Sequence, residues 1–160
     1  MNEMNIIGGS SAMRLGEIGL NNFAPYLMNR IMGRYNNSLR EEMAALGLTT
    51  PKMRSLAVLS VIDGILLRDL AVYAVVDVST LSRTLDALEA DGLVKCKTDS
   101  SDGRARRVFI ADEGRFAFDS LWPHMSKTYE RMFVGIGREE RQAFVGTLQK
   151  MLANVRKHDL

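Results

Sequence analysis

The sequence is poor in the residues that build disulfides and metal sites. Its 160 residues include one cysteine, Cys96, and two histidines. A single thiol forms no disulfide within the chain and no thiolate cluster for zinc, so a reducing compartment, the cytoplasm, is expected. The two histidines, His124 and His158, lie far apart and are more typical of surface or capping positions than of metal ligands. Neither a metal nor a cofactor is expected.

Long hydrophobic runs are also missing. The segment from residue 55 to 78 is rich in apolar residues, but four charged residues interrupt it: Asp63, Arg68, Asp69 and Asp77. No uncharged stretch reaches the roughly 20 residues that a membrane-spanning helix needs. The N-terminus, MNEMNIIGGSS, has neither the basic start nor the apolar run of a secretory signal. The segment is therefore expected to form a buried core, without membrane association.

A strong excess of one charge is the third absence. The net charge is +2 and the isoelectric point is about 8.8, which permits an anionic partner without requiring one. The length suits one domain, or one domain with a dimerisation appendage. The motifs of phosphate-binding loops, zinc proteases and dithiol redox sites do not occur, and no nucleophile is paired with a base. An enzyme is therefore not expected.

Helical periodicity covers most of the first half of the chain. Residues 1–20 are weakly patterned and are expected to form a flexible arm that a partner would order. One long amphipathic helix is predicted over residues 22–47, where apolar residues recur every three or four positions. A second helix is predicted to begin with Thr50 as its N-cap and Pro51 in its first position, and to end near Ile62.

A short helix and a capped helix follow, and then the periodicity changes. The short helix is predicted over residues 67–73. The next helix begins after Asp77, a good N-cap, and ends at Gly92, which suits a left-handed C-cap position. Two segments then alternate as β-strands do, on either side of a turn-rich stretch: residues 93–97 and 106–110, around residues 98–103.

Two further helices complete the chain. Asp112 is predicted to cap the first of them, and Pro123 inside it should kink the helix or split it in two. Gly135 and Gly137 end that helix, and the last helix is predicted over residues 138–157 with one apolar face. The expected fold class is therefore mostly α, with a small β-hairpin.

The order of these elements predicts a winged helix-turn-helix. In that motif a short helix, a tight turn and a capped helix precede a two-stranded hairpin. The start of the capped helix would offer free N–H groups and the positive end of the helix dipole to phosphate. Small hydroxyls there permit close approach to base edges, and an arginine at a hairpin tip suits the narrow, negative minor groove. The candidates on the helix are Ser79, Thr80, Ser82 and Arg83.

The block from the capped helix to the hairpin resembles the MarR/SlyA-type transcription regulators. The similarity lies in VSTLSRTLDALEADGLV followed by DGRARRVFIADEGR, and it extends over roughly residues 22–157. Its most specific part is Asp102-Gly103-Arg104, which fits the family's D-x-R wing signature and follows shortly after the helix end. A lone D-x-R would be uninformative, but its position between that helix and a strand makes the signal specific.

The resemblance implies a homodimer built from intertwined terminal helices. Residues 21–48 and 112–160 would be the dimerisation helices, and residues 49–111 the winged helix-turn-helix lobe that binds DNA. The recognition helix, about residues 78–90, would enter the major groove of a double-stranded DNA partner and the wing its minor groove.

The resemblance also assigns roles to single residues. Ser79, Thr80, Ser82 and Arg83 match recognition-helix contacts. Arg104 matches the wing arginine that reaches DNA, and Asp102 matches the acid that holds the wing or its arginine. Arg106 and Arg107 are weaker wing candidates, because neighbours on a strand face opposite sides. Arg54 and Arg68 are candidate phosphate contacts, or arginines of a solvated helix face.

The regulator implied by the family is a ligand-responsive repressor. It would bind a pseudo-palindromic operator with half-sites about one helical turn apart, near 34 Å. A small aromatic effector would bind between the DNA-binding lobe and the dimer helices and shift the spacing of the two recognition helices. The sequence does not locate that pocket.

Several alternatives stay open at this point. The segment 77–110 carries equal numbers of acidic and basic side chains, so only their arrangement argues for DNA. A winged helix can also serve as a protein-interaction module. The hydroxyls at the start of the recognition helix could be capping residues only. Cys96 on the wing strand is interpreted as a structural thiol, although some relatives sense oxidants with cysteine.

The sequence departs from the family pattern at three positions. Val75 stands where the helix-turn-helix turn usually has glycine, so the turn must adopt another geometry or carry strain. Leu66 stands where a threonine usually caps the third helix, and Ala111 where one usually opens the fifth. These departures affect local geometry more than fold.

Overall fold

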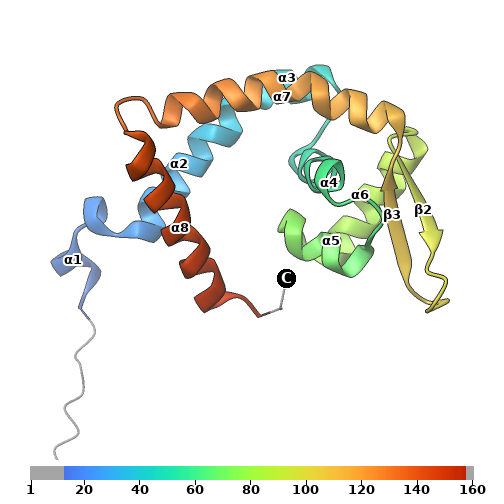
Figure 1. Cartoon of the computed structure of the whole chain (residues 1–160), viewed down its shortest axis with the longest axis horizontal. Coiled ribbons are helices and arrows are strands. Elements are labelled where there is room, and N and C mark those ends of the chain that lie inside the picture. Colours follow the sequence, from blue (N-terminus) through green and yellow to red (C-terminus); the bar gives the residue numbers. More distant parts are fainter. Residues whose placement is uncertain (1–12, 158–160) are drawn as a thin grey trace, which may run out of the picture. The chain divides into compact units, whose positions relative to one another are not determined.

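A computed structural model describes residues 13–157 of the chain. The chain forms two units, Met1–Asn37 and Ser38–Leu160, which are described separately. In their described residues both units are mainly helical, and the second carries the only sheet found there (Figure 1). No helix in the described part of the chain is long and apolar enough to cross a membrane.

The first unit holds more regular structure than the weak sequence pattern indicates. Residues 1–12 of the predicted arm lie outside the described residues. The rest contains α1 (Leu15–Ile18) and the 3-10 turn η1 (Leu20–Asn22). Helix α2 (Ala24–Ser38) follows, and it has no buried residue. Glu17 helps to form α1, since its Oε2 accepts from the backbone N–H of Arg14 at 3.0 Å.

The prediction of one helix over residues 22–47 is wrong at Leu39. Helix α2 ends at Ser38, and a separate helix α3 (Arg40–Ala45) begins in the second unit. Leu39 itself is fully buried and has a φ of −99° and a ψ of −1°, away from regular helix geometry. The break involves only Leu39, and this residue continues the apolar stripe of the residues on either side. The helical periodicity of the sequence is therefore unbroken there, and it does not reveal the end of α2.

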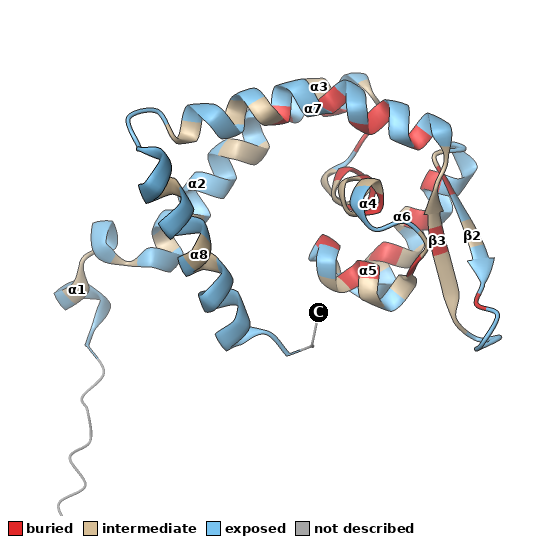
Figure 2. Ribbon diagram, in the orientation of Figure 1, coloured by how far each residue is buried: buried red, intermediate tan, exposed pale blue. Residues whose placement is uncertain are grey.

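The core of the second unit lies between three helices and the sheet. Helices α4 (Thr50–Val61), α5 (Leu67–Ala74) and α6 (Val78–Ala90) pack on one another. Figure 2 shows their buried faces in red. Most of the fully buried side chains of these elements are leucines and valines, among them Leu56, Leu59, Leu70, Leu81, Leu85, Leu88, Val94 and Val108. Burial of this size is the main source of the unit's stability.

The sheet has three strands where the sequence predicted two. The predicted hairpin is present as β2 (Val94–Thr98) and β3 (Arg106–Ile110). In addition, β1 (Ile65–Leu66) pairs antiparallel with β3, with Ile65 opposite Val108. The strand order is β1-β3-β2. A strand of two residues has no periodicity to detect, so it could not be read from the sequence.

Two helix caps differ from the sequence prediction by one residue. The N-cap of α4 is Thr49 and not Thr50: the Thr49 hydroxyl accepts from the Lys52 N–H at 3.4 Å, and Pro51 follows in the first turn. The N-cap of α7 (Asp112–Met132) is Ala111, which has no side chain to accept a bond. Asp112 is instead the first residue of that helix, where its charge still favours the helix dipole.

Helix α7 runs through Pro123 without interruption. Its 21 residues form one helix, so the predicted split does not occur (Figure 1). The following turn contains Gly135 with a φ of +81°, which a glycine adopts at little cost. Helix α8 (Arg138–Val155) then begins at the N-cap Gly137. No residue of α8 is buried, and Figure 2 colours most of it as exposed.

The junction between α7 and α8 is fixed by one arginine. The Arg141 guanidinium lies over the Phe133 ring, 4.3 Å from its centroid. Its two terminal nitrogens donate to both carboxylate oxygens of Glu130, at 3.2 and 2.9 Å. This contact lowers the pKa of Glu130 and raises that of Arg141. The angle at which α8 leaves α7 therefore depends on a bidentate ion pair placed against an aromatic ring.

Candidate nucleic-acid interface

The start of α6 is capped by its own acidic residue. Asp77 has an extended backbone, and its Oδ1 accepts from the Thr80 N–H at 2.8 Å and from the Ser79 hydroxyl at 2.6 Å. The Ser79 bond is the main reason why the pKa of Asp77 is well below its usual value. The sequence-based expectation of N–H groups free for phosphate is therefore not met at Thr80, because a carboxylate already occupies this helix end.

The candidate residues of α6 lie at different depths. Ser79 and Arg83 are exposed and stand one helical turn apart on the side away from the core. Thr80 and Ser82 are half-buried beside the fully buried Leu81. The exposed stripe of the helix's first two turns is thus formed by Ser79 and Arg83.

The turn between α5 and α6 adopts a left-handed conformation at Val75. This residue has a φ of +54° and a ψ of +51°, and no other described residue except glycine has a positive φ. A β-branched side chain in this region is strained. Of the two expected alternatives, another geometry or strain, the turn therefore shows strain at Val75. The Arg54 Nη1 donates to the Val75 carbonyl at 3.5 Å, which engages this candidate phosphate contact within the protein.

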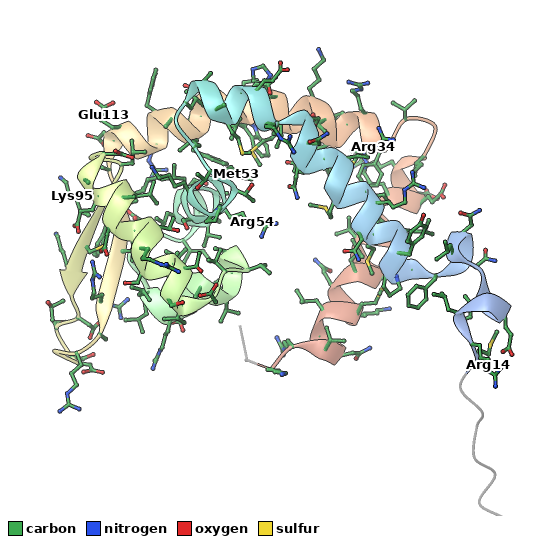
Figure 3. All side chains as sticks on the ribbon, turned by 180° about the vertical axis from the view of Figure 1, so that it is seen from behind. Arg14, Arg34, Met53, Arg54, Lys95 and Glu113 are labelled. Carbon is green, nitrogen blue, oxygen red and sulfur yellow. The ribbon has the colours of Figure 1, made fainter. Side chains whose placement is uncertain are left out.

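Helix α4 places Arg54 next to a core residue. Met53 is almost completely buried, whereas Arg54 is only half-buried (Figure 3). Figure 3 also shows Lys95 on the outward side of β2, where it is exposed. Basic side chains thus lie on both the helical and the hairpin side of the lobe.

The wing is organised around Asp99, a residue that the sequence reasoning missed. Its Oδ1 accepts from the backbone N–H groups of Ser101 and Asp102 at 2.8 and 3.1 Å. Its Oδ2 accepts from Arg107 Nε, and hydrogen bonds, first of all that of the Ser101 hydroxyl, keep the pKa of Asp99 well below its usual value. The signal was present as an Asp-x-Ser turn sequence, in which an aspartate bonds to the backbone two residues on.

Arg107 connects the wing to the loop before β1. Besides Asp99, its guanidinium contacts the Gly64 carbonyl, with Nη1 at 2.8 Å. The neighbouring Asp63 Oδ1 accepts from the Ile110 N–H on β3, also at 2.8 Å. Arg107 is therefore engaged on the protein side of the hairpin, and its role is to position the wing.

Arg106 connects the wing to α6. Its terminal nitrogens lie 3.8 Å from Asp86 Oδ1 and 3.9 Å from Glu89 Oε2. Glu89 Oε1 also accepts from the Cys96 N–H at 2.8 Å. The two acids of α6 thus partly neutralise Arg106 and hold the hairpin against α6. Burial raises the pKa of the Cys96 thiol, which disfavours the reactive thiolate form.

The tip of the wing presents Arg104. Asp102 Oδ1 accepts from the backbone N–H of Arg104 at 3.0 Å, so the acid of the D-x-R signature fixes the tip. The Arg104 residue is exposed. It shares a cleft of about 300 Å³ with the beginning of α5, and the lining includes Leu66, Leu67 and Arg68 on one side and Asp102, Arg104 and Arg106 on the other.

This cleft gathers four of the residues selected from the sequence, which come from two separate segments. The Arg68 side chain is 79% exposed, with its Nε 3.6 Å from Asp69. The described residues contain no group of three or more His, Cys, Asp or Glu side chains that would hold a metal ion. The lining of the cleft combines three arginines with Asp102 and apolar residues. Guanidinium groups such as those of the three arginines can bind phosphate oxygens in a bidentate manner.

Comparison with known proteins agrees with this architecture. The MarR family model matches residues 46–105. A transcriptional regulator of the MarR family from Silicibacter pomeroyi has a similar structure, with 57% identity, a TM-score of 0.88, and coverage of 92% of this chain and 100% of that one. The transcriptional repressor IacR of Pseudomonas putida is 23% identical over 133 residues, which are 83% of this chain and 80% of that protein.

A more distant structure shares the fold and has a known ligand. It is BpsR of Bordetella bronchiseptica, described as regulated in its DNA binding by 6-hydroxynicotinic acid. It is 23% identical, has a TM-score of 0.69, and covers 80% of this chain and 97% of that one. With the winged helix-turn-helix, the D-x-R wing and a relative that is 57% identical over its whole length, the chain belongs to the MarR family of transcriptional regulators.

Proposed function

We propose that the protein is a homodimer that binds double-stranded DNA in a sequence-specific manner. Helix α6 would enter a major groove, and the wing would reach the adjoining minor groove. The observation that carries this proposal is the cleft that is lined by Arg68 of α5 together with Arg104 and Arg106 of the wing. Several arginines around one cleft suit the strongly anionic phosphate backbone of DNA.

The contacts within the protein divide the arginines into two groups. Arg83, Arg104 and Arg68 extend from an exposed surface and are the proposed DNA contacts, the first to base edges and the other two to the minor groove and phosphate. Arg54 and Arg107 donate to carbonyl or carboxylate groups of the protein, so we assign them to positioning the turn and the wing.

A second copy of the chain is the proposed partner of α8. An amphipathic helix buries its apolar face when it is stable in a globular protein, yet α8 is without any buried residue. The exposed apolar side chains of α8 are Phe144, Val145, Met151, Leu152 and Val155. The exposed apolar residues Leu27, Ile31 and Met32 of α2 suggest that this helix takes part as well.

We also propose that the protein is a repressor controlled by a small aromatic ligand. A repressor among its relatives and a structural neighbour regulated by 6-hydroxynicotinic acid support this proposal. The ligand would bind better to a dimer whose α6 helices are wrongly spaced for DNA. The ligand would weaken DNA binding only as far as its affinity for the wrongly spaced dimer exceeds its affinity for the dimer that fits DNA.

The proposed function is tested by a gel shift with the DNA that flanks the gene, in the presence of heparin as a competitor. We expect a salt-dependent complex, and we expect Arg104→Ala to make the plot of log K against log [salt] less steep by about two units, because each of the two subunits loses one ion contact with DNA. The control is Arg131→Ala, which removes an exposed arginine from the last turn of α7. No complex with any duplex would favour the alternative, a winged-helix module that binds protein.

A further inference from the structure

Three exposed apolar side chains lie around the turn between α5 and α6. Tyr73 is 42% exposed, Val75 is 77% exposed and Val78 is 54% exposed. In contrast, the leucines Leu81 and Leu85 on the next turns of α6 are fully buried. Val78, the first residue of α6, is thus the one large apolar residue of this helix outside the core.

Two hydrogen-bond donors beside Val78 already have a partner within the protein. The Ser79 hydroxyl and the Thr80 N–H both donate to Asp77 Oδ1. The Asp77 carboxylate also places a negative charge at this end of the helix, which opposes the approach of a phosphate group. The first turn of α6 therefore offers a partner the exposed methyl groups of Val78, while the Ser79 hydroxyl and the Thr80 N–H are already engaged.

We propose that Val78 reads thymine in the operator by contacting its C5-methyl group in the major groove. This inference rests on the proposed DNA binding by α6 and adds to it one element of base preference. Thymine is the DNA base that carries an apolar group in the major groove, and aliphatic side chains recognise it through that group. Cβ atoms tilt toward the N-terminus of a helix. If the N-terminal end of α6 enters the major groove first, the Val78 side chain therefore points toward the base pairs.

Polar residues of α6 lie close to Val78 and could contact the same groove of the DNA. Ser82 lies one turn further on the same side of α6, and Arg83 extends from the exposed side. Apolar contact at the helix tip would therefore lie next to groups that read hydrogen-bonding base edges. A thymine read by Val78 is expected to lie near the end of the half-site reached by the start of α6.

The test removes the methyl group from the DNA and from the protein separately. The full-length protein first selects duplexes from a random 30-base-pair pool. Each thymine of the selected sequence is then replaced singly by uracil, which lacks only the C5-methyl, and affinities are measured by fluorescence anisotropy. For the wild-type protein we expect one position per half-site where uracil weakens binding about three- to fivefold, the effect of one buried methyl group.

The same series with Val78→Ala decides the assignment. We expect this variant to bind the thymine duplex more weakly and to lose the uracil effect at that position alone. The control Val61→Ala shortens a valine that is 84% exposed at the end of α4, and it should keep the full effect. Because Val78 is exposed at a helix start, the variant should fold normally, which circular dichroism checks.

The outcomes separate this inference from the proposed function. Selected DNA without a methyl-sensitive thymine, or a uracil effect that persists in Val78→Ala, overturns the role of Val78 and leaves DNA binding intact. Failure to select any duplex over heparin overturns the proposed function, and the inference falls with it.

Discussion

The Arg107 guanidinium on β3 donates to the Asp99 carboxylate at the end of β2, and it thereby joins the two sides of the wing. The same guanidinium donates to the Gly64 carbonyl at 2.8 Å. We expect Arg107→Ala to lower the melting temperature by about 3 to 6 °C, because a largely buried acid loses its charged partner. Arg104→Ala, which removes an exposed side chain of the same wing, is the control. Equal melting temperatures for the two variants would contradict the role given to Arg107.

Acid should weaken the fold through Asp99 and Asp77. The pKa of each is lower in the folded protein than its usual value of 3.8. Their ionised forms therefore stabilise the fold fully above about pH 4, and this contribution is lost as the pH falls through the lowered pKa values. We expect the melting temperature to decrease below pH 4 in a thermal series from pH 7 to pH 3. Asp99→Asn should be less stable at pH 7 and less sensitive to acid; an unchanged acid dependence would rule out this linkage for Asp99.

Replacing Val75 with glycine should stabilise the protein. At a φ of +54° a valine carries about 1 to 2 kcal/mol of strain, while its side chain is 77% exposed and contributes little packing. Glycine removes the strain but adds about 0.5 to 1 kcal/mol of chain entropy, so the net gain is expected to be below about 1.5 kcal/mol.

Urea denaturation measures the effect of Val75→Gly. Val61→Gly, in the last turn of α4 with ordinary helical geometry, should be destabilising and serves as the control. If Val75→Gly lowers the stability as Val61→Gly does, the positive φ of Val75 does not cost the strain assigned to it here.

Replacing Gly114 with alanine should severely destabilise the lobe. Gly114 lies in the first turn of α7, and a Cβ atom added there would overlap the Leu93 carbonyl oxygen and lie 3.1 Å from the Ile110 side chain. Because the first obstacle is backbone, α7 would have to move away from β2, at an expected cost of about 3 kcal/mol or more.

The matched control for Gly114→Ala is Gly33→Ala in α2, where an added Cβ meets nothing within 4 Å. This variant should be neutral or slightly stabilising, since alanine is the better helix former. Chemical denaturation of both variants, with soluble yield as a second readout, checks the prediction. A Gly114→Ala protein as stable as the wild type would show that α7 docks differently at Leu93.

Removing residues 138–160 should produce a monomer. The deletion takes away all of α8, whose exposed apolar side chains are proposed to pack on a second copy. Light scattering should then report the mass of one chain, and operator affinity should fall because a half-site alone is bound weakly. Circular dichroism checks that the remaining helices are folded. A truncated protein that still scatters as a dimer would refute the assignment of α8.

Helices and hairpin were predictable because each has a local signal. The stripe of Leu81, Leu85 and Leu88 marks the buried face of α6, and Asp77 marks its start. The strand bounds of β3 agree with the alternating pattern of residues 106–110. Patterns of this kind express burial on one side of one element, so they can be read without knowing what lies opposite.

The features that escaped prediction depend on contacts between distant segments. Strand β1 exists because Ile65 meets Val108, and the hydrogen bond of Arg107 to Gly64 has no local signature. The same holds for the candidate interface, where the sequence identified Arg68 and Arg104 separately and could not show that they share one cleft. It also treated the start of α6 as open to phosphate, because the competition from Asp77 depends on side-chain geometry.

The sheet also constrains when the lobe can assemble during synthesis. Arg107 and Gly64 are 43 positions apart, and β1 has no strand partner until β3 has left the ribosome. Closing so long a loop is slower than forming a helix. The helices α4 to α6 therefore emerge with one side of their core uncovered, and the nascent chain is most vulnerable to aggregation in the interval before the wing arrives.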